Sequence, residues 1–150
     1  MAKKLENLGA KSAVPYHHKL YKVGKTIPCW SSWSERHVAY IAGLGTFGLH
    51  TSFITEKGAS GRLDSIVTEL GITPTLRTCK SIYDNCIKCF RCVRRCPVGA
   101  IKETGKAVRI CAKKVLAGKT SPDKAVCGKC LTDVSCENCN PTRALSAKRQ

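Results

Sequence analysis

The run from Cys86 to Pro97 constrains this chain more than any other part of its sequence. It places four cysteines at the spacing C-x2-C-x2-C-x3-C and ends with a proline. Two-residue gaps let three thiolates converge from one tight loop, which is the ligand pattern of a bacterial-type [4Fe–4S] cluster. The fourth cysteine of such a run ligates the other cluster in two-cluster proteins, so the sequence predicts a second cluster.

The remaining cysteines are numerous enough to hold that second cluster. The chain has 11 cysteines, and nine of them fall between positions 86 and 139. In a crossed arrangement Cys96 joins three later thiols, while one distant thiol completes the first set. Spacing leaves this distant ligand open between Cys136 and Cys139, and we favour Cys136. The two predicted ligand sets are Cys86, Cys89, Cys92 and Cys136, and Cys96, Cys111, Cys127 and Cys130.

Two other uses of cysteine compete with this interpretation. A disulfide framework is typical of short secreted chains, but the basic start of this chain is not followed by the apolar stretch of a signal peptide. The odd number of cysteines also argues against full pairing. Paired C-x2-C units build zinc ribbons as well, yet zinc does not need three consecutive ligands followed by x3-Cys-Pro. The spacing therefore favours iron and sulfide.

Length and composition limit the number of domains, the size of the core and the cellular compartment. A chain of 150 residues suits one domain or two small lobes, and only 6% of its residues are aromatic. We therefore expect metal binding to supply part of the folding free energy. No apolar stretch approaches the ~18 residues of a membrane-spanning helix. Thiolate-held clusters need a reducing compartment, which predicts a cytoplasmic protein without a membrane partner.

The chain is strongly basic, with a formal net charge of +16. Eight thiolates and two [4Fe–4S]2+ clusters would leave roughly +12. This charge suits an electron-donor or electron-acceptor protein with an acidic surface, or tRNA. No RNA-recognition signature accompanies it, and a solvated surface that offsets anionic clusters is the alternative. Four of the cations lie within the cysteine run: Lys88, Arg91, Arg94 and Arg95.

The expected fold class is α+β, a small helix and β-hairpin lobe followed by a bacterial two-cluster ferredoxin-like domain. The expected organisation has four parts: a basic irregular arm at 1–28, a lobe with a helix, a glycine loop and a β-hairpin at 29–78, the two-[4Fe–4S] domain at 79–141, and a polar tail at 142–150.

Local patterns predict the elements inside these parts. A capping box, Ser32-x-x-Glu35, predicts a helix that begins near Trp33 and ends at the glycines that follow. Residues 51–55 and 62–70 are rich in β-branched residues and predict the two strands of the hairpin. Within the cysteine-rich part we expect a helical turn at 97–101, a hairpin that joins 100–102 to 107–110, and a helical turn at 113–118.

The glycine loop matches the dinucleotide-binding fingerprint G-x-G-x-x-G at Gly43, Gly45 and Gly48. That fingerprint requires a strand before the loop and a helix after it. Here a helix is expected before the loop and a strand after it. The context therefore argues against a nicotinamide or flavin dinucleotide.

The order of these motifs resembles the C-terminal half of the epoxyqueuosine reductases, which are related to corrinoid-dependent reductive dehalogenases. The resemblance rests on Glu35-Arg36, on the glycine loop at 42–48, on two strands and on the cysteine run, and it covers roughly residues 29–139. Residues 33–37 (Trp-Ser-Glu-Arg-His) and 43–49 (Gly-Leu-Gly-Thr-Phe-Gly-Leu) look closest to uncharacterised ferredoxin-like relatives of that family.

The resemblance implies two [4Fe–4S] clusters that feed electrons to a cobalamin, with Gly43, Gly45 and Gly48 near the corrinoid. It implies the same two ligand sets, which leaves Cys139 spare. The sequence departs from the family in lacking the N-terminal lobe that supplies much of the corrinoid pocket, so a partner chain would have to complete it. It also has Thr46 in place of a tryptophan and Cys29 where a catalytic acid is expected.

These inferences predict an iron–sulfur protein that transfers single electrons in a reductase system. The alternatives are a cobalamin-dependent reductase of the epoxyqueuosine reductase type, or its core, and a tRNA-associated module.

Overall fold

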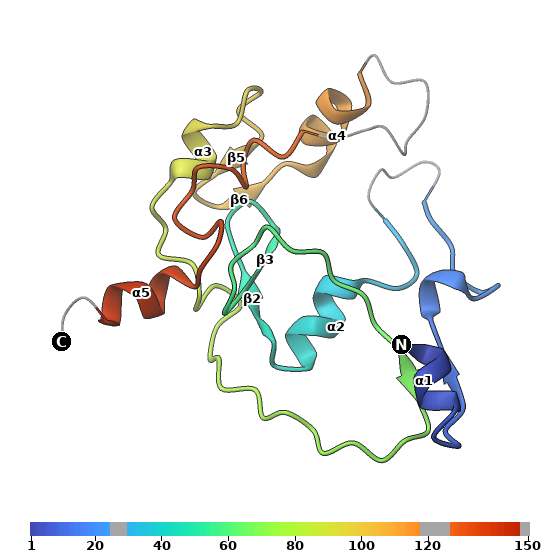
Figure 1. Cartoon of the computed structure of the whole chain (residues 1–150). Coiled ribbons are helices and arrows are strands. Elements are labelled where there is room, and N and C mark those ends of the chain that lie inside the picture. Colours follow the sequence, from blue (N-terminus) through green and yellow to red (C-terminus); the bar gives the residue numbers. More distant parts are fainter. Residues whose placement is uncertain (25–29, 118–126, 148–150) are drawn as a thin grey trace.

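The computed structural model describes residues 1–24, 30–117 and 127–147. The fold is mixed α+β, as expected, and short helices surround two-stranded antiparallel sheets. Figure 1 places the β2–β3 hairpin at the centre, with α2 on one side and the cysteine-rich segments on the other. In chain order the elements are α1 (Ala2–Glu6), β1 (Ser12–Ala13), the 3-10 helix η1 (Pro15–His17), α2 (Glu35–Ile41), β2 (Gly45–Phe47), β3 (Phe53–Thr55), β4 (Val67–Thr68), α3 (Arg91–Arg94), β5 (Ile101–Lys102), β6 (Gly105–Lys106), α4 (Val108–Leu116) and α5 (Pro141–Ala147).

The N-terminal arm contains regular structure, so the prediction of an irregular segment at 1–28 was wrong for its described part. After α1, strand β1 pairs antiparallel with β4, with Ser12 opposite Thr68. The Ser12 hydroxyl donates a hydrogen bond of 2.9 Å to Oγ1 of Thr68. The partner strand lies more than 50 residues later, so no local pattern in the arm reveals the pairing.

Helix α2 begins at Glu35, two residues later than expected, and the predicted capping box was wrong. Ser34 is the N-cap residue, and its hydroxyl lies 2.6 Å from Nδ1 of His37. The hydroxyl of Ser32 instead accepts a hydrogen bond from the backbone N–H of Lys22 at 3.0 Å. Ser32 thus links the arm to the lobe and does not cap helix α2.

The hairpin of the lobe uses a different pair of strands from the predicted ones. β3 lies within the expected strand at 51–55, but its partner is β2, which the glycine loop supplies; Thr46 faces Ile54. Residues 62–70 form only β4, which pairs with β1. A Cβ atom at Gly45 would collide with the backbone carbonyl of Ile54, so glycine permits the close approach of the two strands.

The cysteine-rich part also differs from the prediction beyond its first hairpin. β5 and β6 pair as an antiparallel hairpin, with Ile101 opposite Lys106. Residues 108–116 then form α4 instead of a second strand, and the expected helical turn at 97–101 is reduced to a turn at 97–98. The expected helical turn at 113–118 falls within α4 as far as Leu116, and residue 118 lies outside the described residues.

The predicted polar tail is helical over most of its length. Asn140 begins α5, because its side-chain oxygen accepts a 3.1 Å hydrogen bond from the backbone N–H of Thr142. Pro141 occupies the first helical position, where a missing N–H costs nothing. In the described ranges, no helix is long and apolar enough to cross a membrane.

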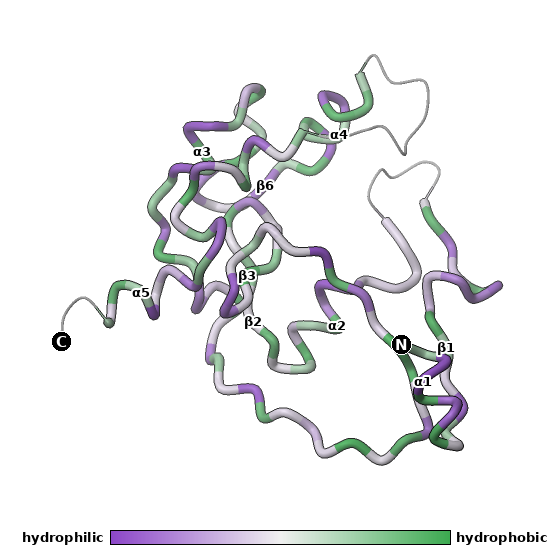
Figure 2. Tube along the Cα trace, viewed as in Figure 1, coloured by the Kyte–Doolittle hydropathy of each residue, from purple (hydrophilic) through white to green (hydrophobic). Residues whose placement is uncertain are grey.

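A small buried core joins the hairpin to the cysteine-rich loops. Two of its members, Cys92 and Cys136, are predicted cluster ligands, so the core and the candidate site are continuous. Figure 2 shows hydrophobic residues spread along the whole trace instead of gathered in one layer. The core residues are Leu49, Ile54, Ala59, Cys92, Ile101, Val134 and Cys136.

Candidate metal centres

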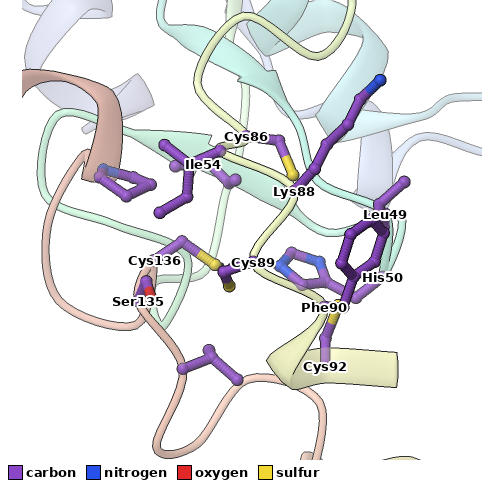
Figure 3. A pocket seen from close by; sticks show the side chains of 13 residues that line it. Leu49, His50, Ile54, Cys86, Lys88, Cys89, Phe90, Cys92, Ser135 and Cys136 are labelled. Atoms are coloured by element: carbon purple, nitrogen blue, oxygen red, sulfur yellow. Dashed lines mark hydrogen bonds between the residues drawn. The ribbon is translucent and has the colours of Figure 1, made fainter. Parts of the chain in front are cut away.

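The first candidate site is a pocket between the hairpin and the cysteine loops. Its lining includes all four thiols of the first predicted ligand set: Cys86, Cys89, Cys92 and Cys136. Cys86 and Cys89 come from the loop that leads into α3, Cys92 comes from α3 itself, and Cys136 comes from the segment before α5 (Figure 3). The rest of the lining is mainly apolar, so the pocket can shield its contents from water.

Left-handed backbone conformations shape the loop that carries the first three cysteines. Lys88 has a φ of 49° and Phe90 a φ of 56°, values that non-glycine residues rarely adopt. Each costs of order 1–2 kcal/mol, so the surrounding structure must hold them in place. They turn the chain between successive cysteines and direct the Lys88 side chain away from the pocket (Figure 3).

Hydrogen bonds fix this loop to the β2–β3 hairpin. Oγ1 of Thr46, a fully buried residue, accepts a 2.8 Å hydrogen bond from the backbone N–H of Asn85. The Asn85 side chain donates in turn to the carbonyl of Ile54 at 2.9 Å. Because Asn85 directly precedes Cys86, the hairpin determines where the first ligand begins.

Cys136 rather than Cys139 completes the first pocket. The carbonyl of Cys136 accepts a 2.8 Å hydrogen bond from the N–H of Ala59, which ties the segment to the turn after β3. Cys136 is buried, and its Sγ lies 3.2 Å from Nε2 of His50. Cys139 is exposed, does not line the pocket, and directs its thiol to the carbonyl of Ser135. Spacing left Cys136 and Cys139 as alternatives, and the geometry favours Cys136.

The thiols of the first pocket oppose one another's ionisation. Burial, followed by the charges of Cys86, Cys89 and Cys92, raises the pKa of Cys136 to about 12. Burial also raises the pKa of Cys92 to about 11, with contributions from neighbouring thiolates. Four thiolates crowded in an apolar pocket require a cationic centre to offset their charge.

At Cys89, hydrogen-bond donors lower the pKa of the thiol instead of raising it. Burial alone would raise the pKa of Cys89, but the backbone N–H of Arg91 and the hydroxyl and backbone of Ser135 lower it below its ordinary value. Such donors stabilise a thiolate directly, and they do the same for a thiolate bound to iron.

The second candidate site is a pocket between the end of α3, helix α4 and the loop at 127–131. All four thiols of the second predicted set line it: Cys96, Cys111, Cys127 and Cys130. Burial would raise the pKa of Cys96, but the backbone N–H groups of residues 98, 100 and 101 lower it, and that of Ala100 lies 3.2 Å from Sγ. The pKa of Cys130 is raised by burial, which Lys106 opposes.

Arg95 attaches the loop of Cys127 and Cys130 to the end of α3. Its guanidinium donates to the carbonyl of Lys129 at 3.1 Å, to the carboxylate of Asp133 at 3.1 Å and to the hydroxyl of Thr132 at 3.3 Å. A planar guanidinium can make these three bonds at once. Arg95 directly precedes Cys96, so it links two of the segments that line the second pocket.

The residues present fit a [4Fe–4S] cluster in each pocket. Each donor set consists of four thiols, the soft ligands that iron–sulfur clusters use, and they line a pocket instead of meeting at a point. Among residues 1–24, 30–117 and 127–147, no three histidine, cysteine, aspartate or glutamate side chains are arranged to hold a single metal ion.

The three glycines of the loop do not share a site. Gly43 has a φ of +77° and ends α2, where a Cβ atom would approach the backbone of Arg77 at 3.2 Å. Gly45 lies against β3. Gly48 lines a groove that runs from α2 to Cys111 on α4. Gly48 thus has a described groove beside it, and the prediction that Gly43, Gly45 and Gly48 all bind a cofactor stays a prediction.

Of the cysteines outside the two ligand sets, Cys79, like Cys139, lines neither pocket. The thiol of Cys79 lies 3.9 Å from the carbonyl of Gly45, away from both ligand sets. Cys29, which we considered in place of a catalytic acid, lies outside the described residues.

Sequence reasoning missed three residues that support the first site. His50, Thr46 and Ser135 each touch a ligand or the segment before it. None belongs to a metal-binding motif, and His50 precedes Cys136 by 86 positions. No local pattern around His50, which is followed by the polar residues Thr51 and Ser52, distinguishes it in the sequence.

Comparison with known proteins identifies one family. The model of the 4Fe-4S binding domain matches residues 80–102, which include all four cysteines of the run. No curated protein and no solved structure matches the chain. The chain is therefore an iron–sulfur protein that binds a [4Fe–4S] cluster and takes part in electron transfer.

Proposed function

We propose that the chain carries two [4Fe–4S] clusters and passes single electrons through them in a reductase system. The observation that carries this proposal is the pair of pockets, each lined by four cysteines. Cys86, Cys89, Cys92 and Cys136 would hold the first cluster, and Cys96, Cys111, Cys127 and Cys130 the second. Each cluster, when bound, supplies a one-electron couple between its 2+ and 1+ states.

The protein's own residues prepare both sites for that chemistry. Leu49, Ile54 and Val134 are buried and keep water from the first pocket. Hydrogen bonds to Cys89 and Cys96 stabilise the thiolate forms. Cys92 of the first set lies on α3 and Cys96 of the second set follows just after this helix, which supports a short separation between the two pockets.

The exposed cations beside the first pocket suit an acidic redox partner. Lys88, Arg91 and Arg94 are exposed on the loop and helix that carry the first three cysteines. Arg91 lies 3.9 Å from Asp133, an exposed pair of small energetic weight. We infer that an acidic electron-transfer protein docks here in a reducing compartment such as the cytoplasm.

A cobalamin-dependent reductase is the second candidate, and the groove between Gly48 and Cys111 favours it. Arg36, His37 and Tyr40 line this groove on the side of α2. A ligand bound in it would lie beside Cys111, a proposed ligand of the second cluster. An additional lobe or a partner chain would have to cover its open side.

Iron counting under anaerobic conditions tests the first proposal. The reconstituted chain should bind about eight irons, and Cys89→Ser or Cys130→Ser should each remove about four. Cys136→Ser should also remove about four, whereas Cys139→Ser, the matched control, should remove none. A wild-type count near four would overturn the two-cluster proposal.

Titration with cob(II)alamin followed by EPR separates the two candidates. A perturbed cobalt signal that Tyr40→Ala abolishes would favour the cobalamin-dependent reductase. An unchanged cobalt signal with about eight irons bound would leave the electron carrier.

A further inference from the structure

His50 is the buried side chain whose position the ligand assignment does not explain. It is only 1% exposed, and it follows Leu49 in the turn between β2 and β3. Its imidazole lies beside Cys136 in the first pocket (Figure 3). The Nε2 atom of His50 lies 3.2 Å from Sγ of Cys136, and the Nδ1 atom lies 3.0 Å from the backbone nitrogen of Ser52.

These two contacts fix which ring nitrogen carries the proton. A backbone N–H can only donate, so Nδ1 must accept the hydrogen bond from Ser52 with its lone pair. The ring proton then resides on Nε2, which faces sulfur. Nε2 of His50 therefore donates a hydrogen bond to Cys136.

The imidazole occupies space that the absence of a side chain at position 48 leaves open. A Cβ atom at position 48 would lie 2.7 Å and 2.8 Å from two atoms of the imidazole, so Gly48 gives the ring its space. The side chain of Ile54 lies 3.1 Å from the same point. Gly48 thus has a role in placing His50, besides lining the groove on its other side.

We propose that His50 is a positioning residue of the first [4Fe–4S] site, which raises the reduction potential of that cluster through a hydrogen bond from Nε2 to Sγ of Cys136. This inference rests on the proposed ligation by Cys136. Reduction adds one electron, and part of its charge resides on the ligand sulfurs. A donor fixed against one sulfur stabilises the reduced state more than the oxidised state.

The hydrogen bond from His50 should change the reduction potential of only one of the two clusters. In the second pocket, the described donors to Cys96 are backbone N–H groups, which a side-chain substitution leaves in place. The second cluster therefore provides an internal reference within the same protein.

Anaerobic redox titration of the holoprotein, monitored by EPR, tests the proposal with two variants. In His50→Asn the amide occupies the place of Nδ1, so it can accept from Ser52 but has no donor near Cys136. In His50→Gln the amide nitrogen can reach the place of Nε2 and retain the donor. We expect His50→Asn to make the potential of one cluster more negative, His50→Gln to restore it in part, and the other cluster to stay unchanged.

Full iron content with unchanged potentials in His50→Asn would overturn the proposal. A second measurement decides the matter if His50→Asn fails to load its cluster. In the reduced wild-type protein with 15N-labelled histidine, pulsed EPR should detect a nitrogen coupled to the cluster spin, and the coupling should survive in a His37→Gln control. Its absence would overturn the proposal.

These outcomes are distinct from failure of the proposed function. If Cys136→Ser keeps about eight irons, the ligand assignment is wrong and the inference about His50 falls with it. If Cys136→Ser loses about four irons while the potentials of His50→Asn stay unchanged, only the inference about His50 is wrong.

Discussion

Replacement of Thr46 by valine would remove one hydrogen bond between the hairpin and the cysteine run. Thr46 is 0% exposed, and its Oγ1 accepts the backbone N–H of Asn85 at 2.8 Å. Valine matches the shape of threonine but has no acceptor, so Thr46→Val leaves a buried N–H without a partner. The bond from the Asn85 side chain to Ile54 remains.

The expected free-energy cost of Thr46→Val follows from the one backbone N–H, that of Asn85, which loses its acceptor. An unsatisfied buried N–H costs about 1–3 kcal/mol. Since every 1.4 kcal/mol changes an equilibrium tenfold, the loop before Cys86 should open about 5- to 150-fold more often. Cys86 lines the first pocket, so iron held there should become accessible in the same proportion.

The assay is iron release from the anaerobic holoprotein to a ferrous chelator in excess. We expect Thr46→Val to accelerate release from one of the two clusters by about 5- to 150-fold. Thr68→Val is the matched control, because Thr68 accepts hydrogen bonds from Ser12 and Leu70 in the β1–β4 sheet. An unchanged rate in Thr46→Val, or an equal acceleration in Thr68→Val, would refute the reasoning.

Two further predictions concern packing and the second pocket. Gly45→Ala places a methyl group against the Ile54 carbonyl and should cost about 1–3 kcal/mol, lowering the melting temperature of the holoprotein by about 3 °C or more. Gly71→Ala, which meets nothing within 4 Å, should not lower it, and equal shifts would contradict the packing argument. Arg95→Lys loses the guanidinium fork and should speed iron release from one cluster by about 2- to 12-fold. Arg62→Lys is its control, and the same rate in both variants would show that the fork is not needed.

The grouping of cysteines around the pockets could be predicted in part because ligand spacing is local. Two-residue gaps place Cys86, Cys89 and Cys92 within one loop, whatever the rest of the chain does. The structure gathers the same eight thiols around two pockets that the crossed arrangement requires. Spacing could not choose between Cys136 and Cys139, because both follow the C-x2-C pattern. Burial and the contact with His50 distinguish them.

The strand pairing could not be predicted because it depends on distant partners. Residues 62–70 have the composition of a strand, yet β4 pairs with the arm and β3 pairs with the glycine loop. The glycines suggested a ligand-binding loop, whereas Gly45 serves strand contact. The start of α5, by contrast, could have been predicted from the sequence. Asn140-Pro141 is a helix-start signal that a search for helix caps would have found.

The interleaved ligand sets make cluster binding and folding one process. Cys96 lies on the same segment as Cys86, Cys89 and Cys92, but it lines the second pocket. Cys136 follows the loop that carries Cys127 and Cys130, but it lines the first pocket. Each cluster would therefore join the segment at 86–96 to the segment at 127–136. Metal binding free energy contributes to folding when the site does not exist in the unfolded chain. We therefore expect loss of either cluster to weaken retention of the other, with Arg95 as the direct link between the two segments.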